Sequence, residues 1–139
     1  MKRATYKLIP LVLAVIILFT TTTVYAATWP EIDLCYEGLA RSAVTLDISD
    51  TGLAQCTAKA TLSSGYSANV TATLQQSTDR VSWDSIKEWS GSGTRIVTAQ
   101  GIYYVLSGYY YRLKVTIELY NSNSELVDTA PAYSTTKYY

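Results

Sequence analysis

Residues 109–120 read Tyr-Tyr-Tyr-Arg-Leu-Lys-Val-Thr-Ile-Glu-Leu-Tyr, and their order is the clearest indication of the fold class. Successive side chains of a β-strand point to opposite faces, so a strand with one buried face carries apolar residues at every second position. Here Leu113, Val115 and Ile117 alternate with charged or polar residues, an order that no amphipathic helix produces. The stretch therefore predicts a long strand with one face turned toward a core.

The same period of two recurs in the runs 44–48, 54–62 and 68–75, and clusters of Ser, Asp, Asn and Gly separate the runs. We expect strands at about residues 39–48, 54–62, 68–75, 82–90, 94–100 and 109–120, with a seventh that begins at Glu125 and is bent or interrupted at Pro131. This spacing, without any helical segment, predicts an all-β chain: a single antiparallel seven-stranded β-sandwich of the immunoglobulin/fibronectin-like class over residues 39–139.

Two features of the fourth strand lead to separate expectations. Trp83, Ile86 and Trp89 are spaced three apart, which an unbroken strand does not accommodate, so we expect a bulge or short turn between the two tryptophans. One tryptophan is expected to fill the core and the other to cover a sheet edge. Gly91-Ser92-Gly93 is expected to end the strand.

The N-terminal 26 residues are typical of a secretory signal peptide. Three basic residues precede a twelve-residue apolar run at 8–19, which is shorter than the roughly 20 residues of a membrane-spanning helix. A polar segment and Val24-Tyr25-Ala26 follow, so we expect cleavage after Ala26 and a secreted chain. An uncleaved N-terminal anchor is the alternative. The residues from 27 to 38 then form an N-terminal segment ahead of the sandwich.

Composition excludes several kinds of chemistry. The chain has no His, so it holds neither a His-based catalytic triad nor a His-ligated metal. Removal of residues 1–26 leaves eight basic and eleven acidic residues, a net charge of −3 that argues against a nucleic-acid partner. No mature segment is strongly cationic and amphipathic, so stable membrane insertion is not expected. We predict a protein that is not an enzyme and needs no cofactor or metal.

The two cysteines, Cys35 and Cys56, are expected to form a disulfide in an exported chain. Closing a loop of this length contributes roughly 3 kcal/mol in the chain-entropy description. The competing interpretations are a Cys-ligated metal, which two Cys without His cannot complete, and a free nucleophile, which has no base beside it in the sequence.

Two stretches carry a resemblance: Leu74-Gln75-Gln76-Ser77-Thr78-Asp79-Arg80-Val81-Ser82-Trp83, and Ser107-Gly108-Tyr109-Tyr110-Tyr111-Arg112-Leu113-Lys114-Val115. Together they resemble the middle hairpin and the penultimate strand of fibronectin type III-like modules. They resemble more closely an uncharacterised family of small secreted bacterial proteins with an early Cys and a late Gly-Tyr-Tyr-Arg strand. The resemblance implies a sandwich fold and extracellular life but no activity, because fold alone does not carry function.

The eleven tyrosines of the mature chain divide by the face on which they fall. Tyr109 and Tyr111 share the face of Leu113, so we expect them in the core, with the Tyr111 hydroxyl holding a neighbouring loop as in a tyrosine corner. Tyr110 and Tyr120 fall on the polar face. With Trp29 and Tyr66, which lie outside the patterned strands, they are the candidate ligand-binding residues, since exposed aromatic rings stack on sugars or anchor protein partners.

Two classes of function follow. The first is a secreted binding module that uses exposed aromatic residues to engage a glycan or a cell-surface protein. The second is a structural or self-assembling protein of the cell surface or matrix, in which the Tyr- and Thr-rich edge at residues 132–139 pairs with another chain. We favour the binding module.

Overall fold

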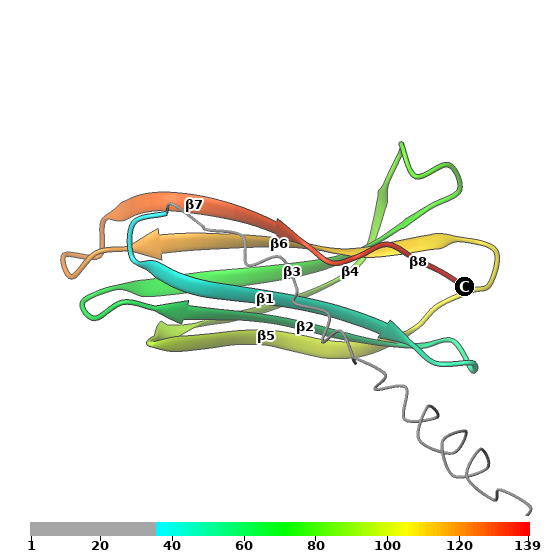
Figure 1. Cartoon of the computed structure of the whole chain (residues 1–139), viewed down its shortest axis with the longest axis horizontal. Helices are drawn as coiled ribbons and strands as arrows, with labels where there is room; N and C mark the ends of the chain where they lie inside the picture. The colour runs from blue at the N-terminus through cyan, green and yellow to red at the C-terminus, as the bar shows by residue number, and fades with distance from the viewer. Residues whose placement is uncertain (1–35) are drawn as a thin grey trace, which may run out of the picture. The chain divides into compact units, whose positions relative to one another are not determined.

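The structure, a computed structural model, describes residues 36–139, and every regular element in this part of the chain is a β-strand (Figure 1). The strands are β1 (Leu39–Ile48), β2 (Leu53–Leu62), β3 (Ser67–Ser77), β4 (Asp84–Thr94), β5 (Ile96–Tyr104), β6 (Tyr110–Tyr120), β7 (Leu126–Tyr133) and β8 (Lys137–Tyr138). The expected signal peptide and nearly all of the N-terminal segment lie outside the described residues.

The strands form two antiparallel sheets that pack as a sandwich (Figure 1). Sheet A has the order β1-β2-β5, and sheet B has the order β4-β3-β6-β7, with β8 continuing beyond β7 along the same edge of β6. The predicted immunoglobulin/fibronectin-like sandwich of seven main strands is confirmed. No helix within residues 36–139 is long and apolar enough to span a membrane.

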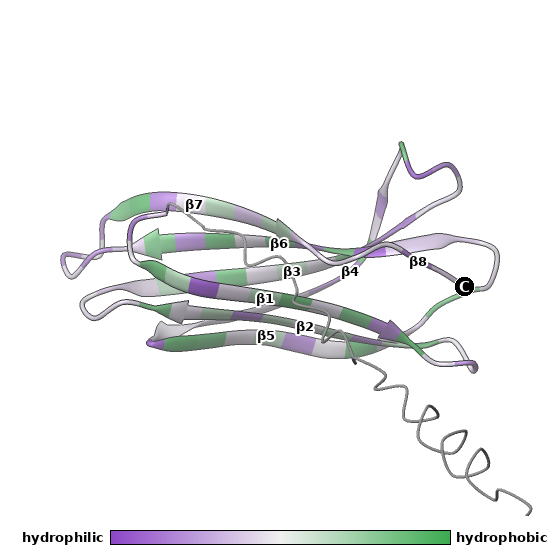
Figure 2. Cartoon of the chain, in the orientation of Figure 1, coloured by the Kyte–Doolittle hydropathy of each residue, from purple (hydrophilic) through white to green (hydrophobic). Residues whose placement is uncertain are grey.

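The core lies between the sheets and is built from the alternating residues that the sequence pattern predicts, an alternation that Figure 2 shows along the strands. Strand β2, the middle of sheet A, contributes mainly small side chains, since Ala54, Ala58 and Ala60 are fully buried. The middle strands of sheet B contribute more of the large ones. The buried residues of β3 and β6 are Ala68, Val70, Ala72, Leu74, Tyr111, Leu113, Val115, Ile117 and Leu119. Burying each of the Val, Leu and Ile side chains stabilises the fold by about 1.5–3 kcal/mol.

Tyr111 ties the start of β6 to the loop that precedes it. Its side chain is fully buried, and its hydroxyl donates a 2.7 Å hydrogen bond to the carbonyl oxygen of Leu106. The expected tyrosine corner is confirmed, because a buried Tyr at this corner satisfies its polar end within the chain. Tyr109 is half-buried and packs against the same core.

A bulge interrupts the pairing of β4 with β3, as the tryptophan spacing predicts. Leu74 pairs with Lys87 and Gln75 pairs with Ser85, so Ile86 is the extra residue. Because one residue is inserted, Trp83 and Trp89 face opposite sides although they are six residues apart. Trp89 packs on the core and lies against Gly101 of β5. Trp89 therefore takes the core position expected of one tryptophan. Trp83 lies on the outer face of sheet B, where its ring stacks on Arg112, so it does not cover an edge as expected of the other.

Gly91-Ser92-Gly93 does not end the fourth strand, which continues to Thr94. A Cβ on Gly91 would overlap the carbonyl oxygen of Thr98, so the glycine allows β4 to run close to β5. The chain then turns through a single residue, Arg95, whose φ of 68° reverses its direction. Strand β5 begins at Ile96 and continues to Tyr104, beyond the predicted end at Gln100.

The C-terminal strand is not interrupted at Pro131, so of the two expected outcomes, a bend or an interruption, the second is wrong. Pro131 pairs with Thr116 inside β7, and β7 is an edge strand, where the missing N–H can face solvent. The break falls instead at residues 134–136. There the Ser134 hydroxyl accepts a 2.8 Å hydrogen bond from the N–H of Leu113, so a side chain replaces the missing ladder acceptor.

Cys56 is a buried residue of β2, on the predicted inward face. Burial raises the pKa of its thiol to about 12. Cys35 lies outside the described residues, so the disulfide stays a prediction. The Cα atoms of a disulfide lie within about 7 Å of each other. Cys56 lies six residues along β2 from Leu62, the partner of Leu39, and six residues span about 20 Å of a strand. The bridge therefore requires the chain before Leu39 to reach back along β2 toward Cys56.

Candidate functional site

Six residues gather on the outer face of sheet B, around the end where β6 begins. We call them the aromatic–arginine cluster: Arg80, Trp83, Tyr110, Arg112, Tyr133 and Tyr138. They come from the β3–β4 loop, from β6, and from β7 and β8. Sheet pairing brings them together from three separate parts of the sequence.

Arg112 is the centre of the cluster. Its guanidinium carbon lies 4.1 Å from the centroid of the Trp83 ring and 5.0 Å from that of the Tyr133 ring. Its Nε donates a 2.9 Å hydrogen bond to Oε1 of Gln75, which fixes the orientation of the group. A guanidinium stacked on aromatic faces keeps its N–H edges available, so the terminal nitrogens of Arg112 can meet a ligand.

A second stack lies beside the first. The guanidinium carbon of Arg80 lies 5.0 Å from the centroid of the Tyr110 ring, and the Tyr110 and Tyr138 rings are 4.9 Å apart at 56°. Tyr138 is 66% exposed and Tyr133 is 52% exposed, so both rings offer a face to solvent. Lys114 is also exposed on this side, opposite Tyr133 in the sheet register.

The β3–β4 loop that carries Arg80 and Trp83 projects from the body of the sandwich (Figure 1). Its geometry is fixed by Asp79, whose Oδ1 accepts 2.8 Å hydrogen bonds from the N–H groups of Val81 and Ser82 and a 2.9 Å bond from the Ser77 hydroxyl. These bonds, led by that of Ser82, hold the pKa of the Asp79 carboxyl below its usual range. The indole nitrogen of Trp83 donates to the Arg80 carbonyl at 3.2 Å. The loop is therefore ordered before any ligand arrives.

The predicted candidates fall at different places. Tyr110 belongs to the cluster. Tyr120 lies on the same face of β6 but ten residues away, about 33 Å along the strand, where its hydroxyl contacts Glu118 and Asn69. Trp29 lies outside the described residues.

Tyr66 has a structural role. Its ring packs directly over Gly38, and its hydroxyl donates a 2.8 Å hydrogen bond to Oε1 of Glu37. This hydrogen bond, ahead of burial and of the Glu37 charge, raises the pKa of the Tyr66 hydroxyl. The ring therefore pins the start of β1 to the β2–β3 loop, on the opposite end of the sandwich from the cluster.

Five members of the cluster were not among the predicted candidates. Alternation along β6 already places Arg112 on the face of Tyr110, so this residue could have been found from the sequence. Trp83 reaches that face only through the bulge at Ile86. Tyr133 and Tyr138 arrive through the pairing of β7 and β8 with β6, which no local pattern encodes.

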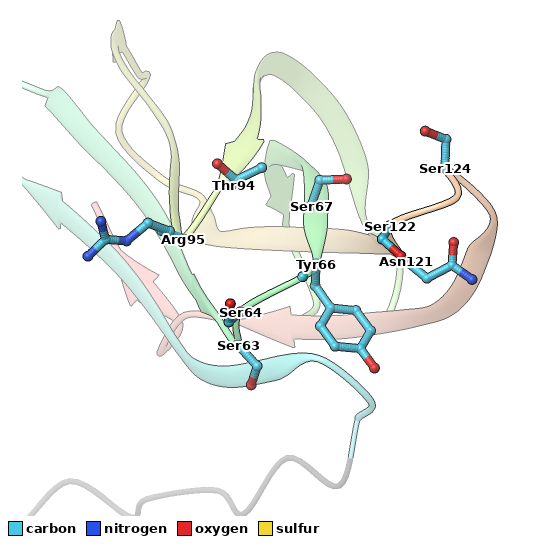
Figure 3. A pocket seen from close by; sticks show the side chains of 10 residues that line it. Ser63, Ser64, Tyr66, Ser67, Thr94, Arg95, Asn121, Ser122 and Ser124 are labelled. Atoms are coloured by element: carbon cyan, nitrogen blue, oxygen red, sulfur yellow. The ribbon is translucent and has the colours of Figure 1, made fainter.

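A hollow of about 400 Å³ lies at the other end of the sandwich, where the β2–β3, β4–β5 and β6–β7 connections meet (Figure 3). Hydroxyl and amide groups line most of it, and Arg95 supplies its cationic side chain. Figure 3 shows Tyr66 at its rim, with the ring directed away from the serines of the β2–β3 loop. This hollow lacks the stacked rings of the cluster. Within residues 36–139 no group of three His, Cys, Asp or Glu side chains is arranged to hold a metal ion.

Comparison with known proteins adds no relative from which a role could be transferred. No protein-family model matches the chain, and no curated protein is significantly similar to it. The resemblance to the small secreted bacterial family therefore stays a prediction, and the function has to be argued from the site.

Proposed function

We propose that this chain is a secreted, non-catalytic binding module that engages an extracellular glycan or a cell-surface protein through the aromatic–arginine cluster. The observation that carries the proposal is the contact of the Arg112 guanidinium with two aromatic rings, those of Trp83 and Tyr133, at centroid distances of 4.1 and 5.0 Å. Aromatic and arginine side chains are the residues that most often dominate binding surfaces, because they combine a large contact area with directed polar groups.

The arrangement is ordered in advance, which favours recognition over chance packing. The loop is held by Asp79, and Arg112 is held by Gln75, so little side-chain entropy is lost when a ligand docks. Extracellular location follows from the predicted signal peptide and belongs to the same proposal.

A glycan array combined with light scattering on the purified protein tests the proposal. We expect the protein to remain a monomer and to bind a defined set of glycans, or a protein of the cell surface, with affinity that falls when Trp83 is replaced by Ala. Thr98→Ala, an exposed change on β5 of sheet A, is the control and leaves binding unchanged. If Trp83→Ala binds as well as the wild type, the cluster is not the site.

The alternative function is self-assembly through the C-terminal edge, residues 132–139. It is favoured by the position of β7 and β8 at the edge of sheet B, with exposed Tyr133 and Tyr138. One side of this edge already pairs with β6, so only its outer side is open to a second chain. Concentration-dependent association without any ligand would support this alternative over the binding module.

A further inference from the structure

We infer that the ligand of the aromatic–arginine cluster is an acidic saccharide, one that carries carboxylate or sulfate groups on its sugar rings. This inference rests on the proposed function and names the chemistry of the ligand. It follows from the charge around the cluster, from the free edges of the guanidinium groups and from the shape of the surface.

Three cationic side chains lie in this part of sheet B, beside the carboxylates of Asp79, Asp84 and Glu88. Arg80, Arg112 and Lys114 lie together, and Arg112 and Lys114 are two residues apart on one face of β6, about 7 Å. Two of these carboxylates are oriented within the protein: Asp79 accepts the loop N–H groups, and Oε2 of Glu88 accepts a 3.2 Å hydrogen bond from Thr73. A chain with eight basic and eleven acidic residues after residue 26 thus concentrates three cations beside one group of aromatic rings.

The guanidinium of Arg112 presents the geometry that planar anions need. Its guanidinium carbon lies over the Trp83 ring and over the Tyr133 ring, and its Nε is bonded to Gln75, which leaves the terminal N–H groups to meet a ligand. A guanidinium edge binds a carboxylate or sulfate with two parallel hydrogen bonds. The stacked rings also reduce the hydration of the cation, which strengthens such a pair.

The rings beside the cations suit sugar faces. Tyr133 and Tyr138 are each more than half exposed and stand on the edge strand, on either side of the break at 134–136. The apolar face of a pyranose stacks on such rings, while the ring hydroxyl groups remain free to hydrogen-bond.

Two other classes of partner, a protein and a nucleic acid, fit this surface less well. A protein partner is usually anchored in a central pocket, whereas the hollows of about 400 and 300 Å³ are lined by residues outside the cluster. Nucleic acids carry a dense row of phosphates and call for a concentrated basic face, whereas the cluster and Lys114 supply three cations.

Isothermal titration calorimetry at low salt tests the inference. The probes are a uronic-acid hexasaccharide, the same hexasaccharide with its carboxyl groups reduced to alcohols, and a sulfated hexasaccharide with its desulfated counterpart. We expect at least one acidic form to bind, with an affinity that decreases as salt is added, and its neutral counterpart to bind about tenfold more weakly or worse.

Variants connect this binding to the cluster. Arg112→Gln is expected to lower the affinity about tenfold or more, and Arg112→Lys is expected to restore little, because a lysine has the charge but not the planar edge. Lys59→Gln removes one positive charge from the outer face of sheet A and is the matched control, with binding unchanged. Tyr138→Ala, at an exposed edge position, tests the cluster without disturbing the Arg112–Gln75 bond, and it should weaken binding as well.

The outcomes separate the inference from the proposed function. Equal binding of the acidic and neutral saccharides overturns the inference but leaves the proposed binding function intact. Binding only to an acidic peptide or to a single-stranded oligonucleotide has the same two consequences. Loss of affinity in Lys59→Gln equal to that in Arg112→Gln also overturns it, because the attraction would then be a general charge effect. If no saccharide and no protein binds the protein at all, the proposed function fails with it.

Discussion

The buried hydroxyl of Tyr111 illustrates how a single residue can both fill the core and fix a loop. Its ring occupies the volume expected of an inward-facing residue of β6, and its hydroxyl reaches the Leu106 carbonyl at 2.7 Å. Alternation predicted the burial of Tyr111, and the likeness to a tyrosine corner predicted the role of its hydroxyl. The loop carbonyl that it contacts became known only from the structure, because local patterns say nothing about distances between a loop and a strand.

We expect Tyr111→Phe to lower the free energy of unfolding by about 1–2 kcal/mol, because the Leu106 carbonyl loses its partner while the packing of the ring is retained. Urea denaturation followed by tryptophan fluorescence measures the change. Tyr104→Phe is the control: Tyr104 is 70% exposed, so removal of its hydroxyl should change stability by less than about 0.5 kcal/mol. Equal effects of the two substitutions would argue against the corner.

The thiol of Cys56 predicts a dependence of stability on alkaline pH. Burial raises its pKa from 9.0 to about 12, so between these values the unfolded chain has lost a proton that the folded chain keeps. Stability is then fully present below pH 9 and falls as the pH rises toward 12, with a slope of at most about 1.4 kcal/mol per pH unit. The pKa of Tyr111 is also raised by burial, and it adds in the same direction.

Urea titrations from pH 8 to pH 11 measure this slope, and Cys56→Ala should flatten it even though the variant starts from a lower stability. The slope requires a free thiol. Peptide mapping by mass spectrometry without reductant therefore accompanies it, because the predicted Cys35–Cys56 disulfide would remove the titrating group. A bridged protein would show the same alkaline slope as Cys56→Ala, and that result would contradict the buried thiol while supporting the bridge.

At the scale of elements, strand β4 shows where sequence patterns succeed and where they stop. The spacing of Trp83, Ile86 and Trp89 correctly predicted a bulge, since an unbroken strand cannot place three large residues at intervals of three. The faces that the two tryptophans occupy depend on which residue is extra, and only the pairing with β3 identifies it as Ile86. The outer position of Trp83 was therefore not predictable from the sequence.

The prediction that Gly91-Ser92-Gly93 ends β4 was wrong for a related reason. Gly91 and Gly93 resemble a strand end when considered by themselves, but Gly91 is needed because the β5 backbone passes beside it. Glycine occurs both where two strands approach closely and where a chain turns, and only the tertiary contacts distinguish the two cases.

We expect Gly91→Ala to destabilise the fold by about 1–3 kcal/mol, because the new methyl group would overlap the Thr98 carbonyl and neither backbone can yield without losing its ladder bonds. Ser92→Ala, at the exposed neighbouring position, should stay within about 0.5 kcal/mol of the wild type. Thermal unfolding followed by circular dichroism compares the two. A Gly91→Ala protein as stable as Ser92→Ala would show that β4 and β5 do not approach as described.

For the whole molecule, the decisive feature is how the C-terminus closes the sandwich. The N–H of Tyr139 donates to the Tyr109 carbonyl at 3.1 Å, and a main-chain oxygen of Tyr139 accepts from the N–H groups of Gly108 and Tyr109. Its hydroxyl donates at 3.2 Å to the carbonyl of Asp50, in the β1–β2 turn. The last residue thus joins sheet B to sheet A, while Tyr138 contributes its ring to the cluster. Stability and the proposed binding surface therefore depend on the same few residues.

We expect a chain that ends at Thr136 to lose about 2–5 kcal/mol of stability, because it lacks at least four hydrogen bonds and the half-buried Tyr139 ring. The truncation also leaves the start of β6 as an unpaired edge, so the shortened protein should associate as its concentration rises while the full chain stays monomeric. Light scattering and urea denaturation measure the two effects. Tyr139→Phe, which removes only the bond to Asp50, should cost about 1 kcal/mol and leave the protein monomeric. If the full-length protein associates as readily as the truncated one, the unpaired start of β6 is not the cause of association. That result would instead favour assembly through the outer side of the C-terminal edge.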